Sequence, residues 1–304
     1  MKIFSGFASL VLAAAAIATL SAENRCPGNV ASVPLQIVNR HQILIAVSVN
    51  HSGPYNFLLD TGTQVTIVDL SLAAELHLNA RGSANVASAG SQTSASFAQV
   101  DLLEAGPHAV ANQAVLLYDL RNMNFANHAV RGILGEDFLE RYDLLIDNAH
   151  RLLCLDDSAT MRASVKGPRV ALEPSAQPAD GQPLPSRLIV AARLSDGMRP
   201  IRLKLDSGAD VSLLYNARQF MALAQFPAAS LQGNGVDGAQ RAFSVLPRQE
   251  VKIGSVYLSG VSFITRLGAE KNTTVAELDG LLPTGLFRRV FIAHADHFAV
   301  LEQW

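Results

Sequence analysis

NFLLDTGTQVTIVD, residues 56–69, ends an apolar run with the carboxylate of Asp60 and then turns at Gly62. Aspartate and glycine are ordinary turn residues, so this motif by itself indicates only a strand that ends in a tight turn. A second stretch, IRLKLDSGADVSLL at residues 201–214, ends its apolar run in the same way at Asp206. The sequence therefore contains two acidic turns, each at the end of a strand-like segment.

The spacing around the two turns is repeated as well. The apolar element GILG, residues 132–135, follows the first turn, and GLLP, residues 280–283, follows the second. Ile133 lies 73 residues after Asp60, and Leu281 lies 75 residues after Asp206. Anchors that recur with nearly equal spacing indicate a duplicated domain. The elements expected behind the two aspartates contain Ile133, Leu134 and Gly135 in the first half and Leu281 and Leu282 in the second.

Short β-branched and aliphatic runs predict an all-β fold, mainly strands with short helices. Strands are expected at residues 42–49, 56–60, 64–68, 97–104, 113–118 and 143–147, with a short helix at 70–78. Prolines crowd the segment between Asp156 and Arg187, which predicts an extended connector. The expected layout is a first lobe at 23–160, a connector at 161–187 and a second lobe at 188–304.

Length and composition limit the classes of function. A chain of 304 residues with 49% hydrophobic content can bury a large core, so disorder is excluded. The formal charge is -2 and the pI is near 6.4, and the basic residues are scattered. Because nucleic-acid binding requires clustered positive charge, nucleic acid is not an expected partner.

The first 22 residues combine Lys2 with a run of leucine and alanine and with small residues near Ala18 and Ala22. This pattern predicts a signal peptide at 1–22, cleaved after Ala18 or Ala22, and hence a periplasmic or secreted protein. The alternative is an uncleaved N-terminal helix. No later segment has the roughly 18 consecutive apolar residues of a membrane span.

The chain has two cysteines, Cys26 and Cys154. In an oxidising compartment they can form a disulfide that ties the mature N-terminus to the segment RLLCLD. Cys154 can equally be a small apolar residue buried in a strand. The sequence leaves both interpretations open.

If the two halves face each other across a pseudo-twofold axis, Asp60 and Asp206 can meet. Two unit charges about 4 Å apart repel by about 4 kcal/mol at an effective dielectric constant of 20, which corresponds to roughly three pKa units. One carboxyl group then keeps its proton while the other is ionised. Such a pair can hold a water molecule, with the carboxylate as general base and the carboxylic acid as proton donor to a peptide carbonyl. This chemistry needs no metal or cofactor.

LLDTGT and KLDSGA, each followed by a Gly-apolar-apolar element, resemble the motifs of aspartic peptidases, and the short halves look most like bacterial retropepsin-like enzymes fused in tandem. The resemblance covers roughly residues 40–156 and 186–300. It implies two closed-barrel lobes, a cleft between them, flap hairpins over the cleft and hydrolysis of peptide bonds. Thr61 and Ser207 would then hydrogen-bond across the base of the catalytic pair, and Gly62 and Gly208 would close the turns.

The sequence departs from this pattern in three places. Pro283 stands where the first half has Gly135. The flap candidates, around Ala89 and Gly90 and around Gly233, Gly235 and Gly238, lack the tyrosine of pepsin-like flaps. Thr63 follows the first glycine, whereas Ala209 follows the second. If Thr63 donates a hydrogen bond to Asp60, Asp206 should be the usual proton holder.

Three other sequence patterns have weak support as functional sites. Gly233, Gly235 and Gly238 fit the G-x-G-x-x-G dinucleotide motif, but no strand precedes them and no helix follows. His294 and His297 form a close pair that lacks further metal ligands nearby. Ser207 has no identifiable histidine and aspartate partners for a serine triad.

The leading hypothesis is a monomeric aspartic endopeptidase acting on a peptide or protein substrate. A module that binds peptides without cutting them is one alternative, for which Pro283 is the main argument. A dimer in which each half pairs with another chain is a second alternative.

Overall fold

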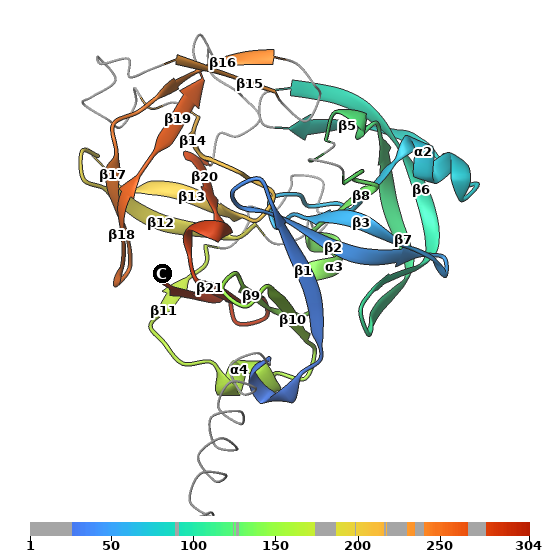
Figure 1. The fold of residues 1–304 in the computed structure, drawn as a ribbon, viewed down its shortest axis with the longest axis horizontal. Coiled ribbons are helices and arrows are strands. Elements are labelled where there is room, and N and C mark those ends of the chain that lie inside the picture. Colours follow the sequence, from blue (N-terminus) through green and yellow to red (C-terminus); the bar gives the residue numbers. More distant parts are fainter. Residues whose placement is uncertain are drawn as a thin grey trace, which may run out of the picture.

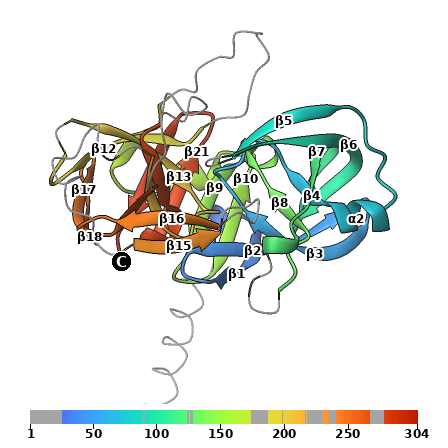
Figure 2. The same cartoon turned by 90° about the horizontal axis from the view of Figure 1, so that it is seen from above.

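A computed structural model gives the fold as two β-rich lobes that lie side by side (Figures 1 and 2). It describes residues 26–88, 91–123, 125, 128–173, 187–197, 199–215, 217, 230–234, 240–266 and 278–304. The expected signal peptide lies outside this set. Among the described residues, no helix is both long and apolar enough to span a bilayer. The fold is mainly β with short helices, as the sequence predicted.

In the residues that the structure describes, the first lobe has seven strands and three short helices. In spatial order, the strands are β2 (Gln42–Val49), β3 (Ser52–Leu59), β8 (Gly132–Leu134), β4 (Ile67–Asp69), β7 (His108–Tyr118), β6 (Ser91–Ala105) and β5 (Ser83–Ser88). An additional pairing of β2 with β6 closes this part of the sheet on itself. The helices are α2 (Leu70–Glu75), η2 (Arg121–Met123) and α3 (Glu136–Leu139).

The second lobe is a nine-stranded sheet. In spatial order, its strands are β15 (Ser230–Asn234), β16 (Gln240–Val245), β19 (Phe263–Arg266), β14 (Ser212–Leu214), β20 (Gly280–Pro283), β13 (Ile201–Asp206), β12 (Ile189–Leu194), β17 (Gln249–Ile253) and β18 (Val256–Val261). One 3-10 turn, η5 (Thr284–Leu286), follows β20. Within the described residues, the two end strands of this sheet, β15 and β18, do not pair with each other.

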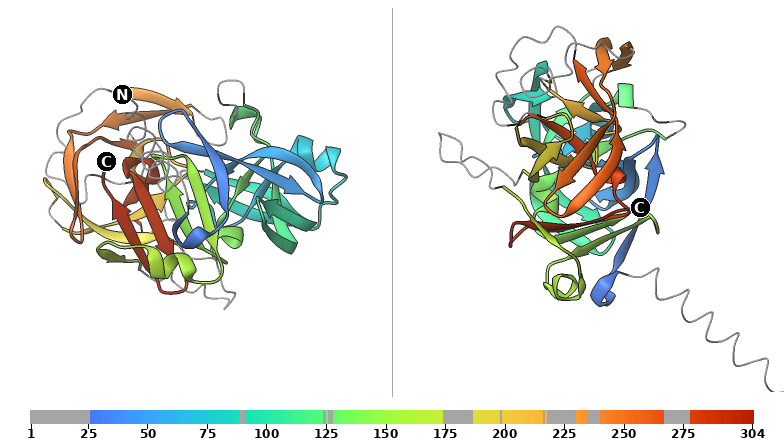
Figure 3. Two further views of the ribbon diagram at one scale, coloured as in Figure 1. Left: turned by 60° about the horizontal axis from the view of Figure 1, so that its bottom comes forward. Right: turned by 90° about the vertical axis from the view of Figure 1, so that its left-hand side faces the viewer.

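A shared sheet joins the lobes. Its strands are β11 (Arg169–Ala171), β22 (Phe298–Glu302), β21 (Arg289–Ala293), β9 (Asp143–Asp147), β10 (Leu152–Asp156) and β1 (Ser32–Val38). The junction between the halves is the antiparallel pair β9 and β21, in which Ile146 lies opposite Val290. Figure 3 shows the red strands β21 and β22 beside the yellow-green strands β9 and β10. This sheet fixes one lobe against the other.

The duplication is visible in strand pairing. In the first lobe β3 runs parallel to β8, with Leu59 opposite Leu134, and β8 pairs antiparallel with β4. In the second lobe β13 runs parallel to β20, with Leu205 opposite Leu282, and β20 pairs antiparallel with β14. Each aspartate therefore follows a central strand held by the same three-strand arrangement.

Element bounds differ from the predictions in a few places. The strand expected at 64–68 begins at Ile67, because the backbone N–H of Thr66 binds the Asp137 carboxylate and not a neighbouring strand. The helix expected at 70–78 ends at Glu75, near His77, which has a φ of 53°. The segment expected to be an extended connector contains helix α4 (Thr160–Ser164) and strand β11, because β11 pairs with β22.

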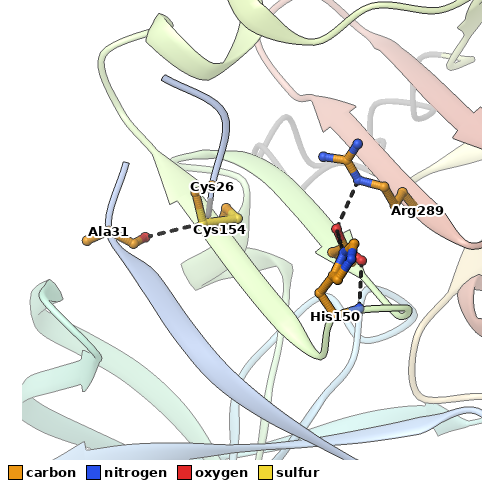
Figure 4. The surroundings of a disulfide bond; sticks show 6 residues. Cys26, Ala31, His150, Cys154 and Arg289 are labelled. Carbon is orange, nitrogen blue, oxygen red and sulfur yellow. Dashed lines mark hydrogen bonds and ion pairs between the residues drawn. A yellow bond between two sulfur atoms is a disulfide. The ribbon is translucent and has the colours of Figure 1, made fainter. Parts of the chain in front are cut away.

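Cys26 and Cys154 form a disulfide across 128 residues (Figure 4). Cys26 precedes the turn η1 (Pro27–Asn29), and Cys154 lies in β10. Both are buried with Met161, Phe291 and Phe298 on one side of the shared sheet. Closing so long a loop contributes about 4–5 kcal/mol in the chain-entropy model. The bond is compatible with an extracellular protein, because such compartments are oxidising.

Candidate active site

Two strand ends bring the aspartates to the boundary between the lobes. Asp60 follows β3, and its backbone N–H donates to the carbonyl of Leu134 in β8 at 3.0 Å. Asp206 is the last residue of β13, opposite Pro283 of β20. The apolar runs before the aspartates are buried strands, so each carboxylate stands on a rigid part of its lobe.

Thr61 and Ser207 bind each other's turns reciprocally. The N–H of Thr61 donates to Ser207 Oγ, and the N–H of Ser207 donates to Thr61 Oγ1, both at 3.0 Å. Each hydroxyl also donates to a carbonyl of the opposite lobe: Thr61 Oγ1 to Leu205 at 3.0 Å and Ser207 Oγ to Leu59 at 2.8 Å. Both residues are fully buried. These four bonds lock the two turns together at the base of the site.

Gly62 and Gly208 let the carboxylates approach the opposite turn. A Cβ on Gly62 would lie 2.4 Å from Asp206 Oδ2, and a Cβ on Gly208 would lie 2.5 Å from Asp60 Cγ. Real side chains do not approach so closely, so any other residue at either position would displace the facing carboxylate. The glycines therefore leave the space in which Asp60 and Asp206 face each other.

The two carboxylates receive different hydrogen bonds. Asp60 accepts one bond on each oxygen: from the N–H of Gly62 on Oδ1 and from Thr63 Oγ1 on Oδ2, both at 2.7 Å. Asp206 accepts two bonds on Oδ1, from the N–H groups of Gly208 and Ala209 at 2.9 Å. A donor on each oxygen favours an ionised carboxylate. The hydrogen bonding of the two aspartates thus differs because Thr63 donates from its hydroxyl group, whereas Ala209 donates from its backbone N–H.

Burial and the nearby charge of Asp60 raise the pKa of Asp206 to about 7. Lys204 and the N–H groups of Ala209 and Gly208 oppose this rise. The direction follows from physics, because a carboxylate that is 7% exposed beside a second carboxylate loses hydration and gains repulsion. Burial and repulsion from Asp60 thus favour the protonated form of Asp206.

The predicted backing elements lie behind the aspartates, but their last residues differ. A Cβ on Gly135 would lie 2.9 Å from the backbone carbon of Val65 and 3.0 Å from the Thr63 carbonyl, so the first lobe requires glycine there. Pro283 occupies the equivalent register in the second lobe and leads into η5. Ile133, Leu134 and Leu282 are buried in the strands β8 and β20, and Leu281 is half-buried.

Two residues that the sequence did not single out complete the turns. Lys204 Nζ donates to the carbonyl of Gly62, and Gln42 Nε2 donates to the carbonyl of Gly208 at 2.9 Å. Each donor comes from the opposite lobe. A lysine inside the apolar run IRLKL was the available signal, because an almost buried cation requires a partner.

The flap candidates fall at hairpins. Strands β5 and β6 pair up to Ser88 and Ser91, and Ala89 and Gly90 between them lie outside the described residues. Gly233 lies in β15, which pairs antiparallel with β16, whereas Gly235 and Gly238 are not described. An antiparallel pair is not the strand–turn–helix unit of a dinucleotide site, which disfavours that interpretation of the glycines.

His294 has a structural partner. Its Nε2 lies 3.0 Å from Glu136 Oε2 and its Nδ1 lies 2.6 Å from the Tyr142 carbonyl. A search of the described part of the chain finds no group of three or more residues able to hold a metal ion.

Comparison with known proteins finds similarity to aspartic peptidases in part of the sequence and in the fold. Residues 45–138 match the family model described as "Aspartyl protease". A search of curated proteins finds no match.

Among solved structures, the chain is similar to the aspartic proteinase from Irpex lacteus. The TM-score is 0.53 at 13% identity, over 90% of this chain and 97% of that chain. A retropepsin-like aspartic protease from Rickettsia conorii aligns over 41% of this chain and 93% of that chain, with 19% identity and a TM-score of 0.30. The family match and the fold shared with the Irpex enzyme confirm the resemblance to aspartic peptidases and support a peptidase role.

Proposed function

We propose that this chain is an exported, monomeric aspartic endopeptidase whose Asp60 and Asp206 activate water against a peptide bond. The observation that carries the proposal is the cross-lobe lock, in which Thr61 and Ser207 hold the two aspartate turns of one chain together. With the turns held in this way, Gly62 lies against the carboxylate of Asp206, and Gly208 lies against the carboxylate of Asp60.

The proposed reaction divides acid and base roles between the lobes. Asp60, with donors on both oxygens, is the carboxylate that takes a proton from the bound water. The water oxygen then bonds to the peptide carbonyl carbon, while the proton of Asp206 passes to the carbonyl oxygen. The resulting diol collapses, the C–N bond breaks, and the proton held by Asp60 goes to the leaving nitrogen. Asp206 recovers its proton from the diol, so the pair again carries one proton.

Incubation with a diverse peptide library between about pH 3 and 7 tests this function, because a coupled carboxyl pair changes protonation in that range. The mature wild-type chain should cleave peptides, and Asp60→Asn and Asp206→Asn should each be inactive. Asp101→Asn, at an exposed aspartate of β6, is the matched control and should cleave like the wild type. Cleavage by the two dyad variants at the wild-type rate would overturn the proposal. Binding of peptides without cleavage would favour the non-catalytic module.

Mixing variants separates a monomer from a dimer with sites shared between chains. If each half pairs with another chain, D60N and D206N chains mixed together form one intact site from Asp60 of one chain and Asp206 of the other. Recovery of activity on mixing would contradict the single-chain site. The expected result is no recovery, together with a monomeric mass in solution.

A further inference from the structure

A buried cation stands beside the candidate dyad. Lys204 lies two residues before Asp206 on β13, and alternate residues of a strand point to the same side. The lysine is 8% exposed, and its Nζ donates to the carbonyl of Gly62 in the other lobe. Lys204 therefore connects the strand that carries one aspartate to the turn that carries the other.

This cation has no equivalent in the first lobe. The pseudo-symmetric position, two residues before Asp60, is Leu58, which is buried with Leu44 and Ile133 in an apolar cluster. The carbonyl of the second turn glycine, Gly208, also receives a cross-lobe donor, but that donor is the neutral amide of Gln42 at 2.9 Å. The carbonyl of each turn glycine thus accepts a hydrogen bond from the opposite lobe, but the donor to Gly62 is a cation and the donor to Gly208 is neutral.

The charges around Lys204 balance when the dyad holds one proton. Ionisable groups near the dyad and Lys204 include Glu136, Glu140 and His294 on the Lys204 side and Tyr215 beside Asp206, and Asp210 follows Asp206 by four residues. Asp210 accepts backbone N–H groups of Arg40 and His41, and Glu136 is paired with His294. A dyad with one proton carries one negative charge, which Lys204 neutralises. Because uncompensated buried charge is strongly unfavourable, the lysine stabilises the ionised carboxylate of the pair.

We propose that Lys204 is a positioning residue that holds the Gly62 turn and sets the pH range in which the Asp60 and Asp206 pair keeps a single proton. The positive charge favours each ionised state of the pair, so its removal moves both proton losses to higher pH. Burial and Asp60 raise the pKa of Asp206, and Lys204 counteracts them. The proposal rests on the proposed peptidase function for its kinetic test only.

The test compares Lys204→Gln and Lys204→Met, which remove the charge, with Lys204→Arg, which keeps it. Gln42→Met is the matched control, because it removes the neutral donor from the equivalent carbonyl. The measurement is kcat/KM against pH for a cleaved peptide. Both neutral Lys204 variants should move the two limbs of the profile upward by about one pH unit or more, the size of effect expected for an opposite charge close to a carboxyl group. K204R should leave the limbs in place, and Q42M should lower activity without moving them.

A titration of the aspartate carboxyl carbons by NMR separates failure of this inference from failure of the peptidase function. If the wild type cleaves no peptide, the peptidase proposal fails, and the pair should still lose its shared proton at a higher pH in K204Q than in the wild type. An unchanged midpoint in both K204Q and K204M would overturn the inference. An equal shift in Q42M would do so as well, because it would assign the effect to turn geometry and not to charge.

Discussion

At the scale of single residues, the position of the two aspartate turns depends on two hydroxyl groups, those of Thr61 and Ser207. Thr61 and Ser207 each accept one cross-lobe bond and donate another, so four buried backbone groups depend on two side chains. A buried backbone group without a partner loses about 1–3 kcal/mol of stabilisation. The aspartates can face each other because these two residues fix the turns beneath them.

We predict that Ser207→Ala lowers the free energy of unfolding by about 2–4 kcal/mol, because it leaves the Thr61 N–H and the Leu59 carbonyl without partners. Chemical denaturation measures the change. Ser207→Thr introduces threonine, the residue at the equivalent position of the first lobe, and its free energy of unfolding should stay close to that of the wild type. Ser244→Ala, at a buried serine of β16, controls for the loss of a hydroxyl group elsewhere. A loss in S207A no larger than in S244A would contradict the role of the lock.

The aspartates, the glycines and the two hydroxyl residues could be predicted from the sequence, because all of them lie in the repeated motif. The sequence did not predict Lys204 or Gln42, whose partners lie in the opposite lobe 142 and 166 residues away. Local patterns report spacing along a strand or helix, whereas a side chain that crosses a lobe boundary depends on how the lobes pack. An isolated lysine in an apolar strand was the one local sign of such a contact.

At the scale of elements, the two lobes use the same strand arrangement with different ends. Gly135 is packed against the backbone of Val65 and Thr63, and its N–H donates to Thr66 Oγ1 at 3.2 Å. Pro283 has no N–H to donate, and its φ of -59° suits a proline ring. The second lobe therefore accommodates proline where the first requires glycine, so Pro283 is not by itself an argument against catalysis.

Alanine at both positions gives a matched comparison. Gly135→Ala should lower the free energy of unfolding by about 1–3 kcal/mol, because its Cβ would overlap backbone atoms that cannot rotate away. Pro283→Ala should lower it by about 1 kcal/mol, mainly through a more flexible unfolded chain. Peptide cleavage should persist in P283A and fall in G135A, in which the backing of Asp60 is displaced. A larger loss of stability or activity in P283A than in G135A would show that the proline has a role in the site.

At the scale of the whole molecule, the shared sheet ties the halves of the chain into one unit. The duplication was readable from the two motifs, but the pairing of β9 with β21 was not. DLLID is buried throughout its length and RVFIA is buried after Arg289, so the alternation that would distinguish one strand partner from another is missing. A second tie between the halves is the buried contact between Glu136, in α3 of the first lobe, and His294, which follows β21.

Three buried groups give the whole molecule a common pH dependence. Burial raises the pKa of Glu136 and, together with Asp60, that of Asp206. Burial is the largest single effect on His294 and lowers its pKa, but the hydrogen bond and charge of Glu136, the bond to the Tyr142 carbonyl and the charge of Glu140 together outweigh it, and the net pKa is raised. Between the ordinary and the raised pKa, the folded chain binds more protons than the unfolded chain. The free energy of unfolding therefore falls as pH rises through each of these intervals.

We predict that the contributions of Asp206 and His294 to the free energy of unfolding fall as pH rises, as measured by urea unfolding of the wild type and of variants at a series of pH values. The contribution of Asp206 is fully present below its ordinary pKa of 3.8 and is lost as pH rises to about 7. The contribution of His294 is present below its ordinary pKa of 6.5 and is lost above it. Asp206→Asn should flatten the lower part of the curve, and His294→Gln should flatten the upper part.

Burial lowers the pKa of His41 and of His108, so these two histidines contribute the opposite trend, a free energy of unfolding that rises as pH rises toward 6.5. Asp156 has a lowered pKa, because hydrogen bonds from Ser158 and Met161 outweigh its burial, so its stabilisation is lost only below its ordinary value of 3.8. A difference in the free energy of unfolding between the wild type and D206N, or between the wild type and H294Q, that does not fall as pH rises would contradict the raised pKa of that group. A slope left intact in both D206N and H294Q would assign the pH dependence to other residues. The two variants also separate the dyad from the interlobe contact, since each controls a different part of the curve.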